Sequence, residues 1–232
     1  MCLESLTLLL VHPFADFYAK TMLLSLAKTI ASKRIVLASS SPRRKEIMEK
    51  IGLPCSIHSP SVEENLSISA YSSIPSYVEA LARLKAEAAI LSLGCAHTYD
   101  LLIAADTVVV LNGQIIGKPR DRQDAVEILK RLSGKSHLVI TGVCIYCCTS
   151  ERDSEMDIFH EVTTVKMGEM DTAVIEAYVD SGEPLDKAGA YGIQGQGCSL
   201  VERIDGDYYN VVGLPAHKMC VHIRSLCEKM LV

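Results

Sequence analysis

The hydrophobic and polar positions of this chain change their period repeatedly from about residue 34 onward. Nearly continuous apolar runs predict strands at about 34–39, 101–111, 136–148 and 157–168, because buried strands lose the polar alternation of exposed ones. Apolar residues at helical spacing predict helices at about 42–52, from Pro75 onward, at 121–132, at 171–181 and from Leu214. A short strand is expected after Pro54, a polar loop from Ser61 to Ser73, and a glycine-rich segment up to about 213. Strands that alternate with helices indicate an α/β protein.

The first 33 residues do not share this alternation. The apolar run Leu6–Val11 is too short for a signal-peptide core, and Glu4 precedes it where positive charge is expected. Residues 14–33 fit an amphipathic helix, and Met22 offers an alternative start. We interpret 1–33 as an extension without a part in the chemistry, followed by a single domain at 34–232. An organelle-targeting role is the alternative, suggested by the basic residues Lys20, Lys28, Lys33 and Arg34.

Composition excludes several classes of protein. With 23 Lys and Arg against 28 Asp and Glu, the net charge is -5, so we expect no general nucleic-acid binding, and any polyanion must meet a local basic cluster. No apolar run approaches the length of a membrane span, so no membrane association is expected. Nine cysteines without a regular framework favour a reducing, cytoplasmic location. The group Cys144, Cys147 and Cys148 lacks a second pair at zinc spacing, so these residues, like Cys220 and Cys227, are interpreted as core.

The segment 35–44 is the first candidate for chemistry. A short apolar strand leads through Ser39 into a turn, where Ser41 suits the N-cap and Pro42 the first position of a helix. Arg43 and Arg44 then occupy the first helical turn, although that end of a helix favours acidic residues. Hydroxyls, amide donors and two guanidinium groups on one turn would hold a phosphate. The alternative is that both arginines are solvated surface residues.

The second candidate is Asp106, a carboxylate inside a long apolar strand. Burying it is costly unless it is paired or bound to a metal. The dipeptide at 112–113, Asn-Gly, predicts a hairpin in which Leu111 pairs with Gln114, and counting on places Lys118 opposite Thr107. A bulge at the preceding glycine would turn Lys118 toward Asp106. A plain buried ion pair is the alternative, but a strand-borne Asp near a Lys and a basic turn suits phosphoryl chemistry.

The third candidate is the glycine-rich segment 182–195, with a further glycine at 197. Its glycines permit close backbone approach, as needed around a base or a phosphate, although a structural loop is the default interpretation. Gln194 offers an acceptor and donors that would read one edge of a pyrimidine. For three polar residues outside this segment we favour structural roles: packing or capping for His137, and ordering of the last loop for Asp207 and Asn210.

In their order and spacing, these segments resemble the Maf family of nucleoside triphosphate pyrophosphatases from about Arg34 to the end of the chain. The motifs are LASSSPRR (37–44), Glu63-Glu64, ADTVVV (105–110), GKP (117–119), LSGKSH (132–137), TG (141–142), GEPLDKAGAYGIQG (182–195) and GDYYNVVGLP (206–215). The resemblance is to the type that acts on dTTP and UTP, which carries Arg after Ser-Pro (Arg43), Thr after the catalytic Asp (Thr107) and the run Tyr191–Gln194. The N-terminal extension is not a family feature.

The resemblance implies an elongated mixed β-sheet flanked by helices, with two lobes around a deep cleft, of the Maf and inosine-triphosphate-pyrophosphatase kind. It also implies a homodimer. The expected activity is hydrolysis of dTTP, UTP and modified forms such as pseudo-UTP and 5-methyl-UTP to monophosphate and pyrophosphate, as housecleaning of the nucleotide pool.

The resemblance also assigns roles to residues. Asp106 would accept a proton from water, and together with Glu64 it would hold Mg²⁺ or Mn²⁺, which prefer oxygen ligands. The positive charges around the phosphates, beside Ser39 and Ser41, would come from Arg43, Arg44, Lys85, Lys118 and Lys187, with Lys118 also counted as catalytic. The choice of base would rest on Arg43, Thr107 and Gln194.

Two hypotheses from other classes compete with this one. A nucleotide-binding regulator of cell division without turnover is suggested by the family's association with division, but such a binder does not need the intact set Glu64, Asp106 and Lys118. A phosphatase or a kinase-like enzyme would cleave a different bond. Products separate the three: pyrophosphate for the expected activity, orthophosphate for a phosphatase and no product for a regulator.

Overall fold

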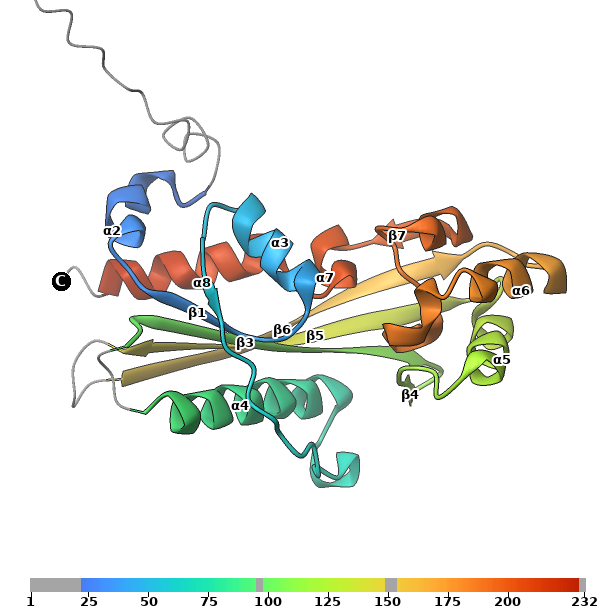
Figure 1. Ribbon diagram of the computed structural model, residues 1–232, viewed down its shortest axis with the longest axis horizontal. Helices are drawn as coiled ribbons and strands as arrows, with labels where there is room; N and C mark the ends of the chain where they lie inside the picture. Colours follow the sequence, from blue (N-terminus) through green and yellow to red (C-terminus); the bar gives the residue numbers. More distant parts are fainter. Residues whose placement is uncertain (1–21, 95–97, 149–153, 230–232) are drawn as a thin grey trace, which may run out of the picture.

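A twisted seven-stranded sheet runs the length of the elongated molecule (Figure 1). The structure, a computed structural model, describes residues 22–94, 98–148 and 154–229. The strands are β1 (Ile35–Ala38), β2 (Ser56–Ile57), β3 (Leu101–Leu111), β4 (Gln114–Ile116), β5 (Ser136–Cys148), β6 (Ser154–Met167) and β7 (Val201–Asp205). Their order is β2-β1-β3-β5-β6-β7, and β4 also pairs with β3. The sheet is mixed, because β1 is parallel to β2 and β3 while the other pairs are antiparallel.

One edge of β3 carries two short partners with a gap between them. β1 pairs with residues 101–104 of β3, and β4 pairs with residues 109–111. Residues 105–108 therefore have no partner strand on this edge within the described chain, while β5 pairs with them on the other edge. A gap of this kind leaves space for side chains from both faces of the sheet, and Asp106 lies in it.

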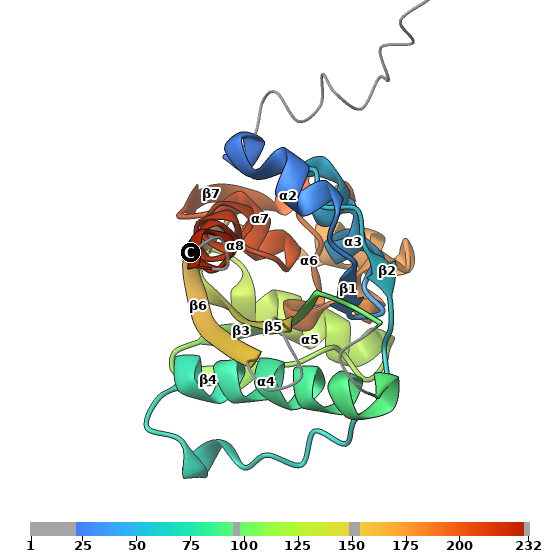
Figure 2. The same ribbon diagram turned by 90° about the vertical axis from the view of Figure 1, so that its left-hand side faces the viewer.

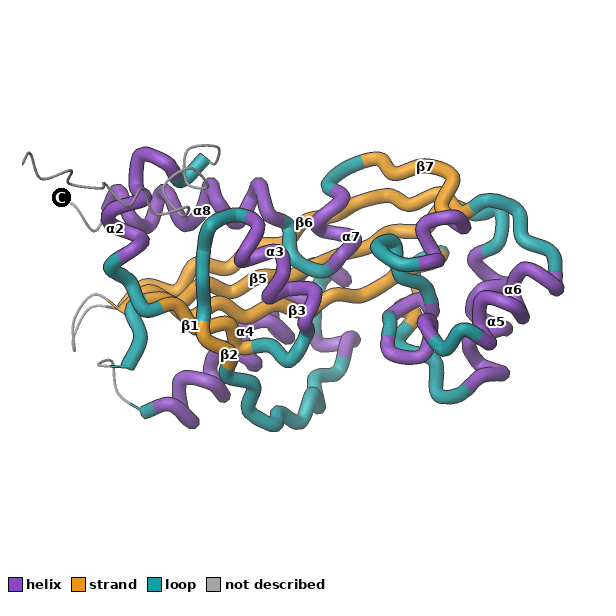
Figure 3. The backbone as a smooth tube through the Cα atoms, turned by 45° about the horizontal axis from the view of Figure 1, so that its top comes forward, coloured by secondary structure: helices purple, strands orange, loops and turns teal. Residues whose placement is uncertain are grey.

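Helices cover both faces of the sheet (Figure 2). They are α2 (Ala27–Ala31), α3 (Pro42–Lys50), α4 (Ile74–Leu93), α5 (Arg122–Leu132), α6 (Thr172–Asp180), α7 (Tyr208–Val212) and α8 (Ala216–Lys229). The 3-10 helices are η1 (Leu24–Leu26), η2 (Ile68–Ala70), η3 (Glu183–Asp186), η4 (Ala188–Ala190) and η5 (Gln196–Leu200). The long helix α4 packs on one face, and α3 and α8 pack on the other. Helices α5 and α6 lie together at the far end of the molecule (Figure 3).

The core is divided between two lobes. One cluster joins α2, α3 and α8 to the sheet through residues such as Leu37, Ile103 and Met219. A second cluster joins α5 and α6 to the other end of β3 and β5, through residues such as Leu129 and Val139. The expected architecture, an elongated mixed sheet with two lobes, is confirmed.

Most predicted elements are confirmed within a few residues, and β5 has the predicted bounds. The strand β7 and the short helix α7 replace the end of the predicted glycine-rich segment. β7 was missed because it is an edge strand with no fully buried side chain, so it lacks an apolar run. The prediction for Asp207 and Asn210 is supported: Asp207 caps α7, and buried Asn210 donates hydrogen bonds to the Val139 carbonyl and Thr163.

Residues 22–33 are packed onto the lobe that contains α8. Leu23, Leu26 and Ile30 are all buried in its core cluster. The domain boundary at residue 33 stays a prediction, and the run Leu6–Val11 lies outside the described residues. No helix among the described residues is long and apolar enough to cross a membrane.

Candidate active site

A cavity of about 900 Å³ opens at the gap in the edge of β3 and separates the two lobes. All eleven residues that the sequence predicted for the site line it, although their individual roles stay predictions. They are Ser39, Ser41, Arg43, Arg44, Glu64, Lys85, Asp106, Thr107, Lys118, Lys187 and Gln194. The topology explains this convergence, since the turn after β1, the segment after β4 and the helix α4 all border the same gap.

The turn between β1 and α3 forms one wall. Ser41 is the N-cap of α3 and Pro42 its first residue, as predicted, but the Ser41 side chain makes no capping hydrogen bond. Its amide instead donates to Ser39 Oγ over 3.2 Å. The start of α3 therefore keeps its serine hydroxyls and arginines beside the cavity.

Arg44 is bound to the protein on three sides. Its Nε donates to the Gly213 carbonyl over 2.8 Å, Nη1 to Ser39 Oγ over 3.1 Å, and Nη2 to Thr107 Oγ1 over 3.0 Å. Desolvation lowers the pKa of its guanidinium from the ordinary value, opposed by the charge of Asp106. A guanidinium has five N–H donors, so two remain beyond these three bonds. The contacts give Arg44 a structural role that the sequence prediction did not include.

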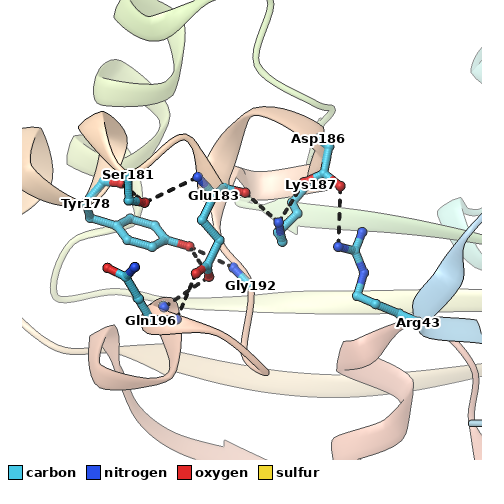
Figure 4. A network of polar contacts seen from close by, with 9 residues as sticks. Arg43, Tyr178, Ser181, Glu183, Asp186, Lys187, Gly192 and Gln196 are labelled. Atoms are coloured by element: carbon cyan, nitrogen blue, oxygen red, sulfur yellow. Dashed lines mark hydrogen bonds and ion pairs between the residues drawn. The ribbon is translucent and has the colours of Figure 1, made fainter. Parts of the chain in front are cut away.

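Arg43 connects the two lobes. Its Nη1 lies 3.5 Å from Asp186 Oδ2, and the other oxygen of Asp186 accepts a 2.6 Å hydrogen bond from Lys187 Nζ (Figure 4). Since Asp186 is two-thirds exposed, this bridge is weak, and an anionic ligand would compete with it for both cations.

Asp106 is paired with Lys85 of α4, not with Lys118. Lys85 Nζ contacts Asp106 Oδ1 and lies 2.9 Å from Glu64 Oε1, so one ammonium group joins the two carboxylates predicted to hold a metal. The close approach of α4 depends on Gly142, which lies opposite Asp106 in β5. A Cβ at Gly142 would be 2.5 Å from the carbonyl oxygen of Val78 in α4.

The predicted placement of Lys118 is wrong. The hairpin register is confirmed, with Leu111 opposite Gln114, but β4 ends at Ile116. The Gly117 carbonyl accepts from the Gly189 amide instead of continuing the ladder as a bulge toward β3. Lys118 nevertheless reaches the cavity. Its side chain makes no ion pair with any residue that the structure describes.

The opposite face of β3 carries Thr107. Its hydroxyl accepts from Arg44 and lies 3.0 Å from Thr141 Oγ1, so it is held in a polar contact network.

His137 of β5 is buried, and its Nε2 lies 2.8 Å from the hydroxyl of Tyr191. Desolvation lowers the pKa of His137 to about 4, so the ring is neutral at neutral pH. This packing agrees with the structural role predicted for His137.

Most glycines of the segment 182–197 serve internal packing, although a Cβ at Gly182 would meet open space. A Cβ at Gly195 would lie 2.3 Å from Glu183 Oε2, and a Cβ at Gly197 would lie 2.5 Å from the hydroxyl of Tyr178. At Gly189, φ is +73° and a Cβ would meet Val109 at 2.9 Å. The close approach that the sequence predicted is real, but in this structure the partners are side chains of the protein.

Besides Glu46, two acidic residues of the cavity, Glu183 and Asp186, were missed by the sequence analysis. Both lie in the recognised run 182–195, and η3 presents both to the cavity. The available signal was their position beside Lys187, because a cation that serves an anionic ligand needs a counter-charge before the ligand binds.

The formal charges of the basic and acidic side chains that line the cavity cancel. Among the described residues that line it, five are basic and five acidic; the acidic ones are Glu46, Glu64, Asp106, Glu183 and Asp186. A triphosphate of about four negative charges would therefore need additional positive charge. The oxygen donors of Asp106 and Glu64 fit Mg²⁺ or Mn²⁺, since Mg²⁺ is commonly held by one or two carboxylates together with phosphates and water. No cluster of three or more His, Cys, Asp or Glu residues suited to a metal occurs in the described chain.

Four of the five cysteines predicted to be small core residues are buried, whereas Cys148 is only half-buried. Cys144 and Cys147 are buried in β5, and Cys220 and Cys227 are buried side chains of α8.

Comparison with known proteins gives one family and several close relatives. The profile described as "Maf-like protein" matches residues 34–226. The chain is 43% identical over 187 residues to a dTTP/UTP pyrophosphatase of Symbiobacterium thermophilum, covering 80% of this chain and 90% of that protein. It is 42% identical over 193 residues to a dTTP/UTP pyrophosphatase of Aquifex aeolicus, covering 83% and 95%. A human probable bifunctional dTTP/UTP pyrophosphatase/methyltransferase protein is 42% identical over 199 residues, which are 84% of this chain and 32% of that protein.

Among solved structures, a nucleoside-triphosphatase / dITP/XTP pyrophosphatase from Mycobacterium abscessus aligns with 14% identity and a TM-score of 0.38, over 86% of this chain and 97% of that chain.

Proposed function

The chain belongs to the Maf family, and from this premise we propose that it is a nucleoside triphosphate pyrophosphatase that hydrolyses dTTP and UTP. The observation that carries the proposal is the joining of Asp106 and Glu64 by Lys85 inside a cavity that also holds four other basic side chains. Its relatives named dTTP/UTP pyrophosphatase support the choice of substrates.

The basic residues account for binding of the triphosphate. Arg43 and Lys187 hold Asp186 in the free protein, and phosphate oxygens would replace that carboxylate as their partner. Lys118 and the turn around Ser39 and Ser41 would contact the remaining oxygens. The two free N–H donors of Arg44 would add to them while its other three hold the wall of the cavity.

Asp106 is proposed to take a proton from the attacking water. The water oxygen forms a bond to the α-phosphorus, and the bond from that phosphorus to the oxygen bridging to the β-phosphorus breaks. Monophosphate and pyrophosphate are the products. When bound, Mg²⁺ or Mn²⁺ would screen the phosphate charge, held by Asp106 and Glu64. Lys85 keeps these two carboxylates together in the protein itself.

Pyrimidine choice is proposed to rest on Arg43, Thr107 and Gln194, which line the cavity. Modified pyrimidines such as pseudo-UTP and 5-methyl-UTP are included as substrates. Their polar edges resemble those of UTP, and one methyl group in a pocket changes binding by only about 1–3 kcal/mol.

A pyrophosphate-release screen tests the proposal, run with Mg²⁺ or Mn²⁺ across canonical and modified triphosphates. We expect pyrophosphate and monophosphate from dTTP and UTP, and a loss of about 10³-fold or more in kcat for Asp106→Asn, since the proton acceptor is removed. Asp180→Asn is the matched control, because Asp180 pairs with Arg122 away from the cavity. Orthophosphate as the product would identify a phosphatase. Nucleotide binding without any product would identify a nucleotide-binding regulator of cell division.

We propose a homodimer formed by a single domain at 34–232, located in the cytoplasm, without binding to nucleic acid. Its role would be removal of unwanted pyrimidine nucleotides from the pool. Sedimentation at several protein concentrations tests the homodimer.

A further inference from the structure

The loop that carries Gln194 is fixed at both ends by one pair of side chains, Tyr178 and Glu183 (Figure 4). Two residues before Gln194, the Gly192 amide donates to the Tyr178 hydroxyl over 3.0 Å. Two residues after it, the Gln196 amide donates to Glu183 Oε2 over 2.8 Å. The Gly197 amide donates to Glu183 Oε1 over 3.2 Å.

The pair is itself joined, which makes the anchor one unit. The Tyr178 hydroxyl donates to Glu183 Oε1 over 3.0 Å, and the Tyr178 ring is packed in the core of the α5–α6 lobe. Partial burial raises the pKa of Glu183, but the amides of Gln196 and Gly197 and the Tyr178 hydroxyl outweigh it and hold that pKa below its usual range. A Cβ at Gly195 would clash with Glu183, one at Gly197 with the Tyr178 hydroxyl, and one at Gly192 chiefly with the Lys187 side chain. Larger residues could therefore not be packed as closely in this loop.

A glutamine that selects a base needs a fixed orientation. Its amide offers a carbonyl acceptor and an NH₂ donor, which exchange places when the side chain flips. Uracil and thymine present an acceptor at O4 where cytosine presents an amino donor. Which of these groups meets the base depends on where the backbone places the Gln194 side chain, so a loop that shifts would discriminate less between the bases.

We propose that Tyr178 and Glu183 are positioning residues for pyrimidine selection: they fix the backbone of the loop 192–197, and with it the place from which Gln194 reaches the base, so that uracil and thymine are preferred to cytosine. The proposal rests on the proposed function for its substrates. Neither residue needs to contact the nucleotide. Glu183 also contacts a residue proposed to bind phosphate, because its backbone carbonyl accepts a hydrogen bond from Lys187 Nζ. It therefore connects the selection of the base with the binding of the phosphates.

The test compares kcat/KM for dTTP with kcat/KM for dCTP in Tyr178→Phe and Glu183→Gln. Tyr178→Phe keeps the packed ring and removes the hydroxyl that joins Gly192 to Glu183. We expect each variant to lower the dTTP to dCTP ratio about tenfold, the value of roughly one hydrogen bond. The KM for dTTP should rise while kcat changes little, as for lost binding that is equal in ground and transition states. Glu127→Gln is the control, since Glu127 accepts from Lys130 on the surface of α5.

A double-mutant cycle separates positioning from general damage. If the anchor acts through Gln194, then adding Tyr178→Phe to Gln194→Ala should lower the ratio no further than Gln194→Ala alone. A fully additive loss overturns the proposal. So does a ratio in Tyr178→Phe equal to that of the native enzyme, or an equal fall in kcat for both nucleotides, which indicates a smaller folded fraction.

Hydrogen exchange gives a readout that does not depend on turnover. We expect the amide of Gly192 to exchange about tenfold faster in Tyr178→Phe, because its acceptor is lost, while Glu127→Gln leaves it unchanged. Unchanged exchange in Tyr178→Phe overturns the anchor. If the native protein releases pyrophosphate from no pyrimidine triphosphate, the proposed function fails by itself, whereas exchange still decides whether the anchor exists.

Discussion

Replacing Gly142 by alanine should damage stability and catalysis together, because this glycine sets the distance between the sheet and α4. A Cβ at Gly142 would lie 2.5 Å from the Val78 carbonyl oxygen and 2.8 Å from the Glu79 amide nitrogen. Both are backbone atoms inside a long helix, so they cannot rotate away as a side chain would. The helix must move outward by several tenths of an ångström or more. Lys85 lies seven residues further along the same helix, against Asp106.

The magnitude follows from overpacking. Forcing an extra carbon into a packed site costs about 1–3 kcal/mol, and loss of glycine from the unfolded chain returns about 0.4–1 kcal/mol. We expect a net loss of about 1–2 kcal/mol in the free energy of unfolding. For a protein of this size that corresponds to roughly 2–8 °C in Tm. Turnover should fall more steeply, about 10²-fold in kcat, since displacement of a catalytic group by about 1 Å has effects of that order.

Urea unfolding and the pyrophosphate-release assay measure the two effects on the same preparations. Gly168→Ala is the matched control, because a Cβ there would meet only the Leu200 carbonyl oxygen at 3.6 Å, an ordinary contact. If Gly142→Ala is as stable and as active as Gly168→Ala, the helix does not depend on this glycine for its position and the reasoning is refuted.

Three further predictions concern stability. Burial lowers the pKa of His137 to about 4 in the folded protein, whereas a histidine in the unfolded chain has a pKa of about 6.5. Between these two pH values the unfolded chain therefore binds up to one proton more than the folded protein. Stability should therefore fall by up to about 3 kcal/mol as pH drops from 6.5 to 4, and His137→Gln should remove this part of the pH dependence. Arg44→Lys should lower the free energy of unfolding by about 1–3 kcal/mol, because an ammonium group cannot reproduce three forked hydrogen bonds. Ile30→Ala should lower the free energy of unfolding by about 2–4 kcal/mol, because it removes a buried side chain from the core and leaves a cavity.

Each of these predictions has a control in the chain. His217→Gln changes an exposed histidine and should leave the pH dependence as it is. Arg43→Lys should keep the stability of the native protein, since its pairing with Asp186 is long and exposed. Lys28→Ala alters an exposed position of α2. A His137→Gln variant whose stability falls between pH 6.5 and 4 as steeply as that of His217→Gln would contradict the first argument. An Arg44→Lys or Ile30→Ala variant that unfolds at the same urea concentration as its control would contradict the corresponding one.

The sequence predicted the fold class and the members of the site better than it predicted the contacts between them. Hydrophobic periodicity was sufficient to predict the bounds of β5 and α5 to within one residue, because their buried faces are long and regular. The partner of Asp106 could not be derived, because Lys85 comes from α4 and no local pattern reports which helix covers which strand. The hairpin rule predicted the register of β4 correctly, but it could not place Lys118 because β4 ends at Ile116, before that residue. Glu183 was missed because its role lies in contacts with backbone amides that only the folded loop brings to it.

At the gap in the edge of β3, the two tasks proposed for this site, hydrolysis and pyrimidine selection, fall to two adjacent residues. Asp106 points to the face covered by α4, where Lys85 meets it, and Thr107 points to the opposite face, where Arg44 and Thr141 meet it. A change at residue 107 therefore leaves the contact between Asp106 and Lys85 in place, although it alters the hydroxyl to which Arg44 donates. Such an arrangement would let a single substitution at residue 107 change substrate preference while the carboxylate on the other face keeps its partner.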